Sequence, residues 1–307
     1  MRIFLTGATG YIGAAVLDAL VRGGHEVTAL VRNNEKARRV AKRGAHPVIG
    51  SLEDLESFRG SVDAQDGYVH AAYDTRSGRG PALEQTALEV LIAAARRPRT
   101  AGNVGTDKRF IIYTSGVWVL GRTPEPAAED APINPIALSA FRPVHEKMVL
   151  DASGEHLRTI VVRPGVVYGG GEGMVSEIFK AASNGLVRVV GDGNNHWPLV
   201  YDRDLADLYA RLAAHPDAAG IYHANDEGDE RVNDIVAAIK PYLPVKPDVR
   251  YVPIEEARNK MGPYADALAL DQVVRSPRAR ALGWAPSLHS VAGNAARLLE
   301  EWRASRN

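Results

Sequence analysis

The sequence predicts an α/β fold built on a parallel, doubly wound sheet, and three observations support this prediction. Short apolar runs alternate with segments that have the composition of helices. A glycine-rich turn follows the first apolar run, at Gly7, Gly10 and Gly13. The chain has 307 residues, 45% of them hydrophobic and 24% charged, so it can bury a sizeable core. Alternating strands and helices build a parallel sheet with helices on both faces.

The first element combines a strand, a turn and a helix. Residues 3–5 predict a strand, and residues 14–21 have the composition of a buried helix. Gly7 allows a tight turn, Gly10 lets backbone N–H groups approach a pyrophosphate, and Gly13 lets the helix lie close to its strand. The alternative is a glycine-rich turn in an ordinary βα unit. We predict a dinucleotide site with contacts from Gly7, Ala8, Thr9, Gly10, Tyr11, Ile12 and Gly13.

The end of the second predicted strand, residues 25–31, indicates which dinucleotide is bound. An NAD enzyme usually places a carboxylate here to accept from the ribose 2′-hydroxyl, whereas an arginine accommodates a 2′-phosphate. This chain has Arg32 and Asn33. We therefore predict NADP(H), with Arg32 on the phosphate and Lys36 or Arg38 as further cations. The alternative is that Arg32 only opens a solvated basic helix.

The spacing G-x-x-G-x-x-G, within TGATGYIG, resembles the short-chain dehydrogenase/reductase superfamily, in particular its extended, epimerase-like branch. RPGVVYGGG after the strand predicted at 157–164, and LGW near the C-terminus, extend the resemblance over nearly the whole chain. It implies a Rossmann domain over 1–169, completed by a strand near 218–226. It also implies a smaller domain over 170–307 that mainly binds a small-molecule substrate.

Further strands are predicted at residues 48–49, 67–72 and 109–115, with a helix over 83–97 and a surface connection over 100–108. The helix has an apolar face compatible with a homodimer of the superfamily's usual kind. The resemblance implies cofactor contacts at or just after the ends of strands. These contacts are Ser51, Leu52, His70, Ala71, Ala72, Thr114, Pro164, Gly165 and Val167. His70 is expected to be a packed strand residue and not a base.

The superfamily's catalytic Tyr, followed by a Lys four residues later, is missing in both possible registers. If Lys147 is the family Lys, Pro143 stands at the Tyr position. If Glu146 is the family's helix Glu, then Arg142 replaces Lys and Leu138 replaces Tyr, and we prefer this register. Arg142 can hold the ribose hydroxyls through two N–H groups, but an always-charged arginine cannot shuttle a proton. This eroded motif resembles the atypical members of the superfamily.

A replacement proton donor is therefore sought elsewhere. Gly116 occupies the usual Ser/Thr position, with Ser115 beside it. Tyr73 follows the fourth strand and is a candidate donor, so the catalytic candidates are Ser115, Arg142 and Tyr73. His145 is expected to have a packed or solvent role. The candidate substrate contacts are Trp118, Tyr168 and Trp197.

Composition excludes several functions. Lys+Arg and Asp+Glu are both 37, so nothing global favours nucleic acid or a membrane surface, and there is no cysteine. No metal-ligand spacing and no apolar stretch of membrane-spanning length is present. The first strand begins at Met1, so we expect no signal peptide and a cytoplasmic protein.

We predict an NADP(H)-dependent oxidoreductase acting on a small carbonyl or hydroxyl compound. Sugar nucleotides are not expected as substrates, because His196-Trp197-Pro198 stand where sugar-nucleotide epimerases carry a diphosphate-binding arginine. One alternative is a non-catalytic NADP-binding regulator or sensor. Another is an epimerase or dehydratase with tightly held NADP. The sequence leaves substrate identity, reaction direction and oligomeric state open.

Overall fold

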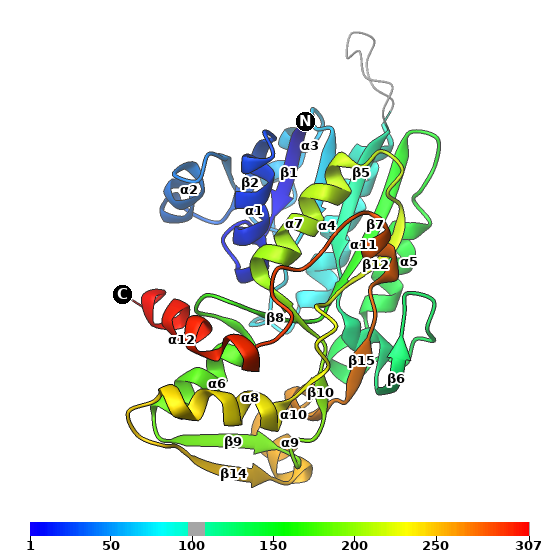
Figure 1. Ribbon diagram of the computed structural model, residues 1–307. Helices are drawn as coiled ribbons and strands as arrows, with labels where there is room; N and C mark the ends of the chain where they lie inside the picture. Colours follow the sequence, from blue (N-terminus) through cyan, green and yellow to red (C-terminus); the bar gives the residue numbers. More distant parts are fainter. Residues whose placement is uncertain (98–107, 307) are drawn as a thin grey trace. The chain divides into compact units, whose positions relative to one another are not determined.

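The computed structural model describes residues 1–97 and 108–306 (Figure 1). The chain folds into two compact units, each built from separate stretches of sequence. Unit 1 comprises Met1–Ser115, Phe141–Arg163 and Ala206–Tyr222, and unit 2 comprises Gly116–Ala140, Pro164–Leu205 and His223–Asn307. The surface connection predicted over 100–108 lies, apart from Lys108, outside the described residues. Within the described ranges, no helix has both the length and the apolarity needed to cross a membrane.

The main sheet confirms the predicted α/β doubly wound fold. Its order, over the described residues, is β12-β7-β5-β4-β1-β2-β3. The strands are β1 (Arg2–Thr6), β2 (Glu26–Val31), β3 (His46–Ile49), β4 (Gly67–His70), β5 (Arg109–Thr114), β7 (Leu157–Pro164) and β12 (Gly220–Ala224). From β1 the chain first builds outward through β2 and β3 and then returns to β4 on the other side. β1 pairs in parallel with both β2 and β4, so the strand order reverses at that point.

Helices connect these strands and cover both faces of the sheet. They are α1 (Tyr11–Arg22), α2 (Asn34–Ala41), α3 (Glu56–Val62), α4 (Gly80–Arg96), α5 (Arg142–Leu150) and α7 (Asp202–Ala214). In Figure 1, α1 and α7 lie in front of the strands. On the other face, Leu88 of α4 and Val149 of α5 join a fully buried cluster with Phe4, Tyr68 and Ile111 of the strands. Alternate strand residues thus supply the two faces of the sheet.

The glycine turn after β1 shows why side chains are excluded there. Gly7 has φ +80°, and a Cβ on it would lie 2.5 Å from the Ala71 carbonyl oxygen. A Cβ on Gly13 would collide with the Gly7 carbonyl. α1 therefore begins directly against the end of β1, as the spacing predicts.

Unit 2 contains four two-stranded pairings within its described residues: β10 with β13, β11 with β8, β14 with β9, and β15 with β6. The strands are β6 (Thr123–Ala127), β8 (Val166–Tyr168), β9 (Leu186–Val190), β10 (His196–Trp197), β11 (Leu199–Tyr201), β13 (Glu230–Arg231), β14 (Asp248–Val252) and β15 (Gln272–Val274). The helices are α6 (Gly173–Ser183), α8 (Val232–Ile239), α9 (Ile254–Met261), α10 (Tyr264–Ala269), α11 (Pro277–Ala281) and α12 (Ala295–Ala304), with short 3₁₀ turns η1 (Val117–Leu120), η2 (Ala137–Ser139), η3 (Lys240–Tyr242) and η4 (Ala292–Asn294). Phe179, Trp197, Ile235 and Trp302 belong to its largest apolar cluster among those described.

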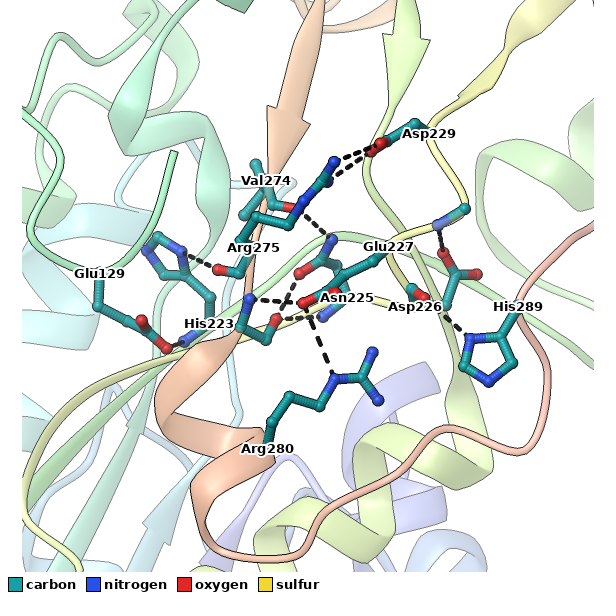
Figure 2. A network of polar contacts seen from close by, with 12 residues as sticks. Glu129, His223, Asn225, Asp226, Glu227, Asp229, Val274, Arg275, Arg280 and His289 are labelled. Carbon is teal, nitrogen blue, oxygen red and sulfur yellow. Dashed lines mark hydrogen bonds and ion pairs between the residues drawn. The ribbon is translucent and has the colours of Figure 1, made fainter. Parts of the chain in front are cut away.

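An acidic loop after β12 ties distant parts of unit 2 together (Figure 2). Asp229 accepts from the Arg275 guanidinium on both carboxylate oxygens, and Glu227 accepts from the Ser276 backbone N–H at 2.9 Å. Glu227 and Asp229 both have positive φ, 64° and 47°. Positive φ is costly for residues other than glycine, so these bonds help to hold the loop in a strained conformation.

Local differences from the sequence prediction have physical reasons. α4 begins at Gly80, three residues before the predicted Leu83, because Pro81 in the first turn needs no N–H partner. The predicted strand over 67–72 ends at His70. The Ala71 N–H still donates to the Thr6 carbonyl at 3.3 Å, and β1 then turns at Gly7, which lies against the Ala71 carbonyl. The short elements α3 and β6 were not predicted, since neither has a long periodic pattern.

We expect Gly67→Ala to destabilise the protein by about 1–3 kcal/mol, the usual cost of overpacking. A Cβ at Gly67 would fall on the Phe110 ring, which is 1% exposed and lies under the Arg158 guanidinium at 4.6 Å. Urea unfolding followed by circular dichroism measures the change. Gly60→Ala is the matched control, because its Cβ meets no atom within 4 Å in helix α3; it should stabilise by about 0.5–1 kcal/mol. Equal midpoints for the two variants would contradict the packing argument.

Candidate functional site

The strand register of unit 1 brings the predicted cofactor residues to one edge of the sheet. Thr6 at the end of β1 is level with Leu30 of β2 and His70 of β4, and Val31 is level with Ile49 of β3. The segments that follow these strand ends therefore share the carboxyl edge. They carry Gly7–Gly13, Arg32, Ser51 and Ala71, and ligands of open α/β sheets bind at this edge.

The start of α1 fits a bound phosphate. Gly10 is the exposed N-cap residue, with no side-chain capping bond, and the first turn of the helix carries no acidic residue. Helix N-termini favour negative charge through their N–H groups and dipole. The close packing of Gly7 and Gly13 leaves a backbone surface at this point that any side chain would fill. The residues present thus fit a pyrophosphate.

A cluster of cations lies beyond β2. Asn33 caps α2 by accepting from the Lys36 N–H at 2.9 Å, so Arg32 lies at the junction between the strand and the helix. Burial, and then the charges of Arg32, Arg39 and Arg76, lower the pKa of Lys36 below its usual value. Lys36 therefore lies close enough to three arginines for their charges to act on it, and Glu35 opposes their effect. Arg39 and Arg76 join Arg32 and Lys36, whereas the sequence interpretation named Arg38.

Arg76 comes from the loop that connects β4 to α4. Asp74 accepts from the Arg76 N–H at 2.9 Å and from the Ser77 hydroxyl, which closes a tight turn. Arg79 forms an exposed ion pair with Glu53, in the loop that follows β3. Since β1 and β2 stand between β4 and β3, this loop passes over their carboxyl ends.

Helix α5 is fixed on the sheet by a buried ion pair. Arg163 donates from Nε to Glu146 Oε1 at 3.0 Å and from Nη2 to Oε2 at 2.6 Å, and both side chains are almost fully buried. The Ser115 hydroxyl donates to the same Oε1 at 2.5 Å. Ser115, a predicted catalytic residue, is thus engaged with Glu146 and 7% exposed.

Arg142 lies one helical turn before Glu146 and reaches the end of β5. Its Nη1 donates to the Tyr113 hydroxyl at 3.1 Å and to the Thr114 carbonyl at 2.9 Å. Nε and Nη2 have no partner among the described residues. These two N–H groups remain available to a ligand, as the sequence interpretation requires of Arg142.

Tyr73 lies directly beside Arg142. Its ring stacks on Phe141 with centroids 5.3 Å apart and 4° between the planes, and the Arg142 guanidinium carbon is 5.3 Å from the Tyr73 centroid. Burial raises the pKa of the Tyr73 phenol, the positive charge of Arg142 opposes this, and Glu84 and Asp74 add to it. The side chain is 39% exposed, so the structure brings two predicted catalytic residues together at a point open to a ligand.

A buried carboxylate that sequence reasoning missed lies behind Arg142. Glu84 of α4 is 2% exposed, and its Oε2 accepts from the Tyr113 hydroxyl and from His145 Nδ1, each at 2.8 Å. Its Oε1 is 3.7 Å from Arg142 Nη1. An ionised carboxylate oxygen can only accept hydrogen bonds, so the hydrogen between Glu84 Oε2 and His145 comes from the histidine. His145 therefore carries a proton on Nδ1. His145 has the packed role expected for it.

His70 is a packed strand residue, as expected. It is fully buried, its Nδ1 lies 2.9 Å from the Thr6 hydroxyl, and its ring stacks on Tyr113. Burial lowers the pKa of His70 to about 4, so the imidazole is neutral at physiological pH.

Comparison with known proteins decides the family. The family model described as "NAD dependent epimerase/dehydratase family" matches residues 3–225. The chain belongs to this family. The match confirms the resemblance to the extended, epimerase-like branch of the short-chain dehydrogenase/reductase superfamily.

Relatives of this family member include oxidoreductases. An uncharacterized protein of Schizosaccharomyces pombe is 32% identical over 299 residues, which cover 95% of this chain and 96% of the relative. The 4-hydroxy-2-methyl-3-oxo-4-farnesyl-3,4-dihydroquinoline-1-oxide ketoreductase of Stigmatella aurantiaca is 28% identical, covering 84% of this chain and 78% of the relative. The crystal structure of a human epimerase family protein with NADPH aligns with TM-score 0.79 at 19% identity, covering 98% and 99% of the two chains, which supports the shared fold.

The predicted substrate contacts lie in unit 2 and are mostly buried. Tyr168 is fully buried and donates to Asp226 at 3.2 Å, and Trp197 donates from its indole N–H to the Leu268 carbonyl at 3.2 Å. Burial, with smaller contributions that include Glu230, raises the pKa of Asp226 to about 7. Trp118 is half-buried against the same apolar cluster. Tyr168 and Trp197 thus pack in the core of the unit, and Trp118 is the one of the three with an accessible surface.

The remaining predicted cofactor residues follow the strand ends. The Thr114 hydroxyl lies 2.7 Å from the Tyr209 hydroxyl and is buried, whereas Ser51, Leu52, Ala71 and Ala72 are half-buried. Pro164 ends β7, with Gly165 and Val167 directly after it in unit 2. A Cβ on Gly165 would collide with the Pro198 carbonyl, so only glycine fits there.

We expect Glu146→Gln to destabilise the protein by roughly 3–5 kcal/mol, because it removes the charge that balances the buried Arg163. Lys147→Gln, on the exposed side of the same helix, should change stability by no more than about 0.5 kcal/mol. Thermal unfolding compares the two variants. If Lys147 were the family lysine, Lys147→Gln would also weaken binding of a dinucleotide in calorimetry, and we expect no such loss.

Proposed function

We propose that this family member is an NADP(H)-dependent oxidoreductase that acts on a small carbonyl or hydroxyl compound without the usual Tyr-x-x-x-Lys pair. The observation that carries the proposal is the grouping of Tyr73 and Arg142 at the carboxyl edge that also holds the glycine turn. When bound, NADPH supplies a hydride, and the protein must supply orientation and a proton.

The cation cluster beyond β2 supports NADP(H) over NAD(H). Lys36 responds to the charges of Arg32, Arg39 and Arg76, so a dianionic 2′-phosphate would relieve repulsion among four cations. No carboxylate stands at Arg32 or Asn33 to accept from a 2′-hydroxyl. Arg32 and Lys36 would hold the phosphate, with Arg76 contributing from the loop after β4.

Arg142 would hold the hydroxyl groups of the nicotinamide ribose. Its Nη1 is occupied by Tyr113 and Thr114, and this fixes the plane of the guanidinium. The two N–H directions left over suit a pair of vicinal hydroxyls, because a guanidinium donates in a rigid fork. This role needs no proton transfer from Arg142.

Tyr73 would give the proton to the reduced carbonyl oxygen. The phenol is held by Phe141 and Arg142, and burial keeps it protonated through neutral pH. Ser115 is a poorer candidate, since its hydroxyl already donates to Glu146. The ketoreductase relative acts, by its name, on a 3-oxo compound, which favours a ketone substrate over a sugar nucleotide.

We expect Arg32→Ala to weaken NADPH binding roughly ten- to a hundredfold, because it removes a charge-assisted phosphate contact. Binding of NADH, which lacks the 2′-phosphate, should change little. Isothermal titration calorimetry with both nucleotides measures the ratio. Arg38→Ala is the matched control on the same helix and should preserve the preference. Failure of the wild type to bind any dinucleotide would contradict the proposal.

We expect Tyr73→Phe to lower kcat roughly 10²–10⁴-fold with NADPH binding unchanged, because it removes only the proton donor. The wild-type rate of ketone reduction should be flat through neutral pH and fall in the alkaline range, where the phenol ionises. A panel of cyclic and open-chain ketones, followed by NADPH absorbance, provides the assay. Full activity of Tyr73→Phe would show that Tyr73 is not the proton donor. Binding of NADPH without turnover of any ketone would favour the regulator or sensor function instead.

A further inference from the structure

The proposed function gives no role to the buried carboxylate of Glu84 in unit 1. Glu84 lies on α4, 58 residues before Arg142 in the sequence, yet both contact Tyr113. Its carboxylate is 2% exposed and has three neighbours: the Tyr113 hydroxyl, His145 Nδ1 and the Arg142 guanidinium. Packing needs no carboxylate at this position, since Leu88 and Leu91 on the same face of α4 are fully buried apolar residues.

Glu84 is ionised in this environment. Burial alone raises the pKa of its carboxyl. The hydrogen bond from His145 and the charge of Arg142, with smaller effects of His70 and Tyr113, together outweigh burial and hold the pKa below its usual value. Burial raises the pKa of Tyr113 so far that its phenol stays protonated and donates. The Glu84 carboxylate therefore holds a negative charge beside the positive charge of Arg142.

This arrangement restricts where the Arg142 guanidinium can lie. One edge of the guanidinium, at Nη1, contacts Tyr113, the Thr114 carbonyl and Glu84. The faces of the Tyr73 and Phe141 rings lie 5.3 and 5.1 Å from its central carbon. An arginine has several rotatable bonds, so its use as a fixed donor requires contacts of this kind.

We propose that Glu84 is the positioning residue for Arg142, holding its Nη1 edge so that Nε and Nη2 face the hydroxyls of the nicotinamide ribose. The inference rests on the cofactor role of Arg142 in the proposed function. Tyr113 assists, because its hydroxyl accepts from Arg142 and donates to Glu84 and so links the two side chains. Where the superfamily uses a lysine to hold the ribose, this chain would use Arg142 of α5 together with Glu84 of α4.

Electrostatics and positioning predict opposite results for Glu84→Gln. Removing a negative charge near an anionic cofactor would, by Coulomb's law alone, strengthen binding. If Glu84 positions Arg142, the variant weakens binding of both NADPH and NADH by about tenfold, the usual coupling between contacting residues. The ratio of the two affinities stays unchanged, because both nucleotides carry the same nicotinamide ribose.

The test is a double-mutant cycle in the full-length chain, with NADPH affinity measured by isothermal titration calorimetry. The variants are Glu84→Gln, Arg142→Ala and the combination, and Glu89→Gln is the control for loss of a carboxylate on the exposed face of α4. We expect Glu84→Gln to have no further effect once Arg142 is gone. Additive losses, or tighter binding by Glu84→Gln, would overturn the proposal. If Glu84→Gln fails to fold, Tyr113→Phe replaces it in the same cycle with the same expectation.

A pH profile of ketone reduction gives a second readout that a merely structural role would not move. The groups that act on the Tyr73 phenol are Arg142, Glu84 and Asp74, and the two carboxylates raise its pKa. By charge alone, Glu84→Gln should shift the alkaline fall in rate to lower pH. If Glu84 also holds Arg142 in place, the variant weakens the effect of this cation on the phenol, and this opposes the shift. A shift to lower pH as large as the one that Asp74→Asn causes, with Arg142 still acting on Tyr73, would count against the proposal. If Arg142→Ala alone leaves NADPH binding intact, the cofactor role of Arg142 fails and this inference falls with it. If Arg142→Ala weakens NADPH binding but Glu84→Gln leaves it unchanged, the positioning role of Glu84 is overturned and the cofactor role of Arg142 stands.

Discussion

The buried ion pair between Glu146 and Arg163 sets the geometry of unit 1. It joins α5 to β7 with two hydrogen bonds, and through Ser115 it also reaches the end of β5. Because side chains four residues apart share a helix face, fixing Glu146 also fixes the direction of Arg142 one turn earlier. Desolvation makes such a pair expensive, so its value lies in placing the helix in a single rotation about its axis.

Two carboxylates of this unit are therefore both buried but do different work. Glu146 accepts from Arg163 and Ser115, and the carboxylate is saturated by structural partners. Glu84 accepts from Tyr113 and His145 and leaves part of the Arg142 guanidinium without a protein partner among the described residues. The Glu146 carboxylate holds helix α5 on the sheet, and the Glu84 carboxylate restrains the Arg142 side chain. The side chains of this site are held by buried contacts. The loop after β4 differs, because the ion pair that holds it, between Arg79 and Glu53, is exposed and therefore weak.

Sequence reasoning identified the features that depend on local pattern. The β1–turn–α1 unit, the parallel, doubly wound sheet and the family follow from glycine spacing and alternating apolar runs. The Glu84 cluster was missed because its partners, Tyr113 and His145, are 29 and 61 residues away. A signal was present: Glu84 stands four residues before Leu88 and seven before Leu91, on the apolar face of its helix. A carboxylate there must have buried partners, but only the folded chain says which.

The interleaving of the two units has a consequence for synthesis of the chain. β12, the edge strand beside β7, is encoded after Pro164–Leu205 of unit 2. During translation β7 therefore emerges well before its neighbour, and its free edge offers unpaired N–H and C=O groups to other nascent chains. A fragment ending at residue 169 would keep that edge open permanently. Expression of unit 1 alone is thus better attempted by joining its separate stretches than by cutting the chain once.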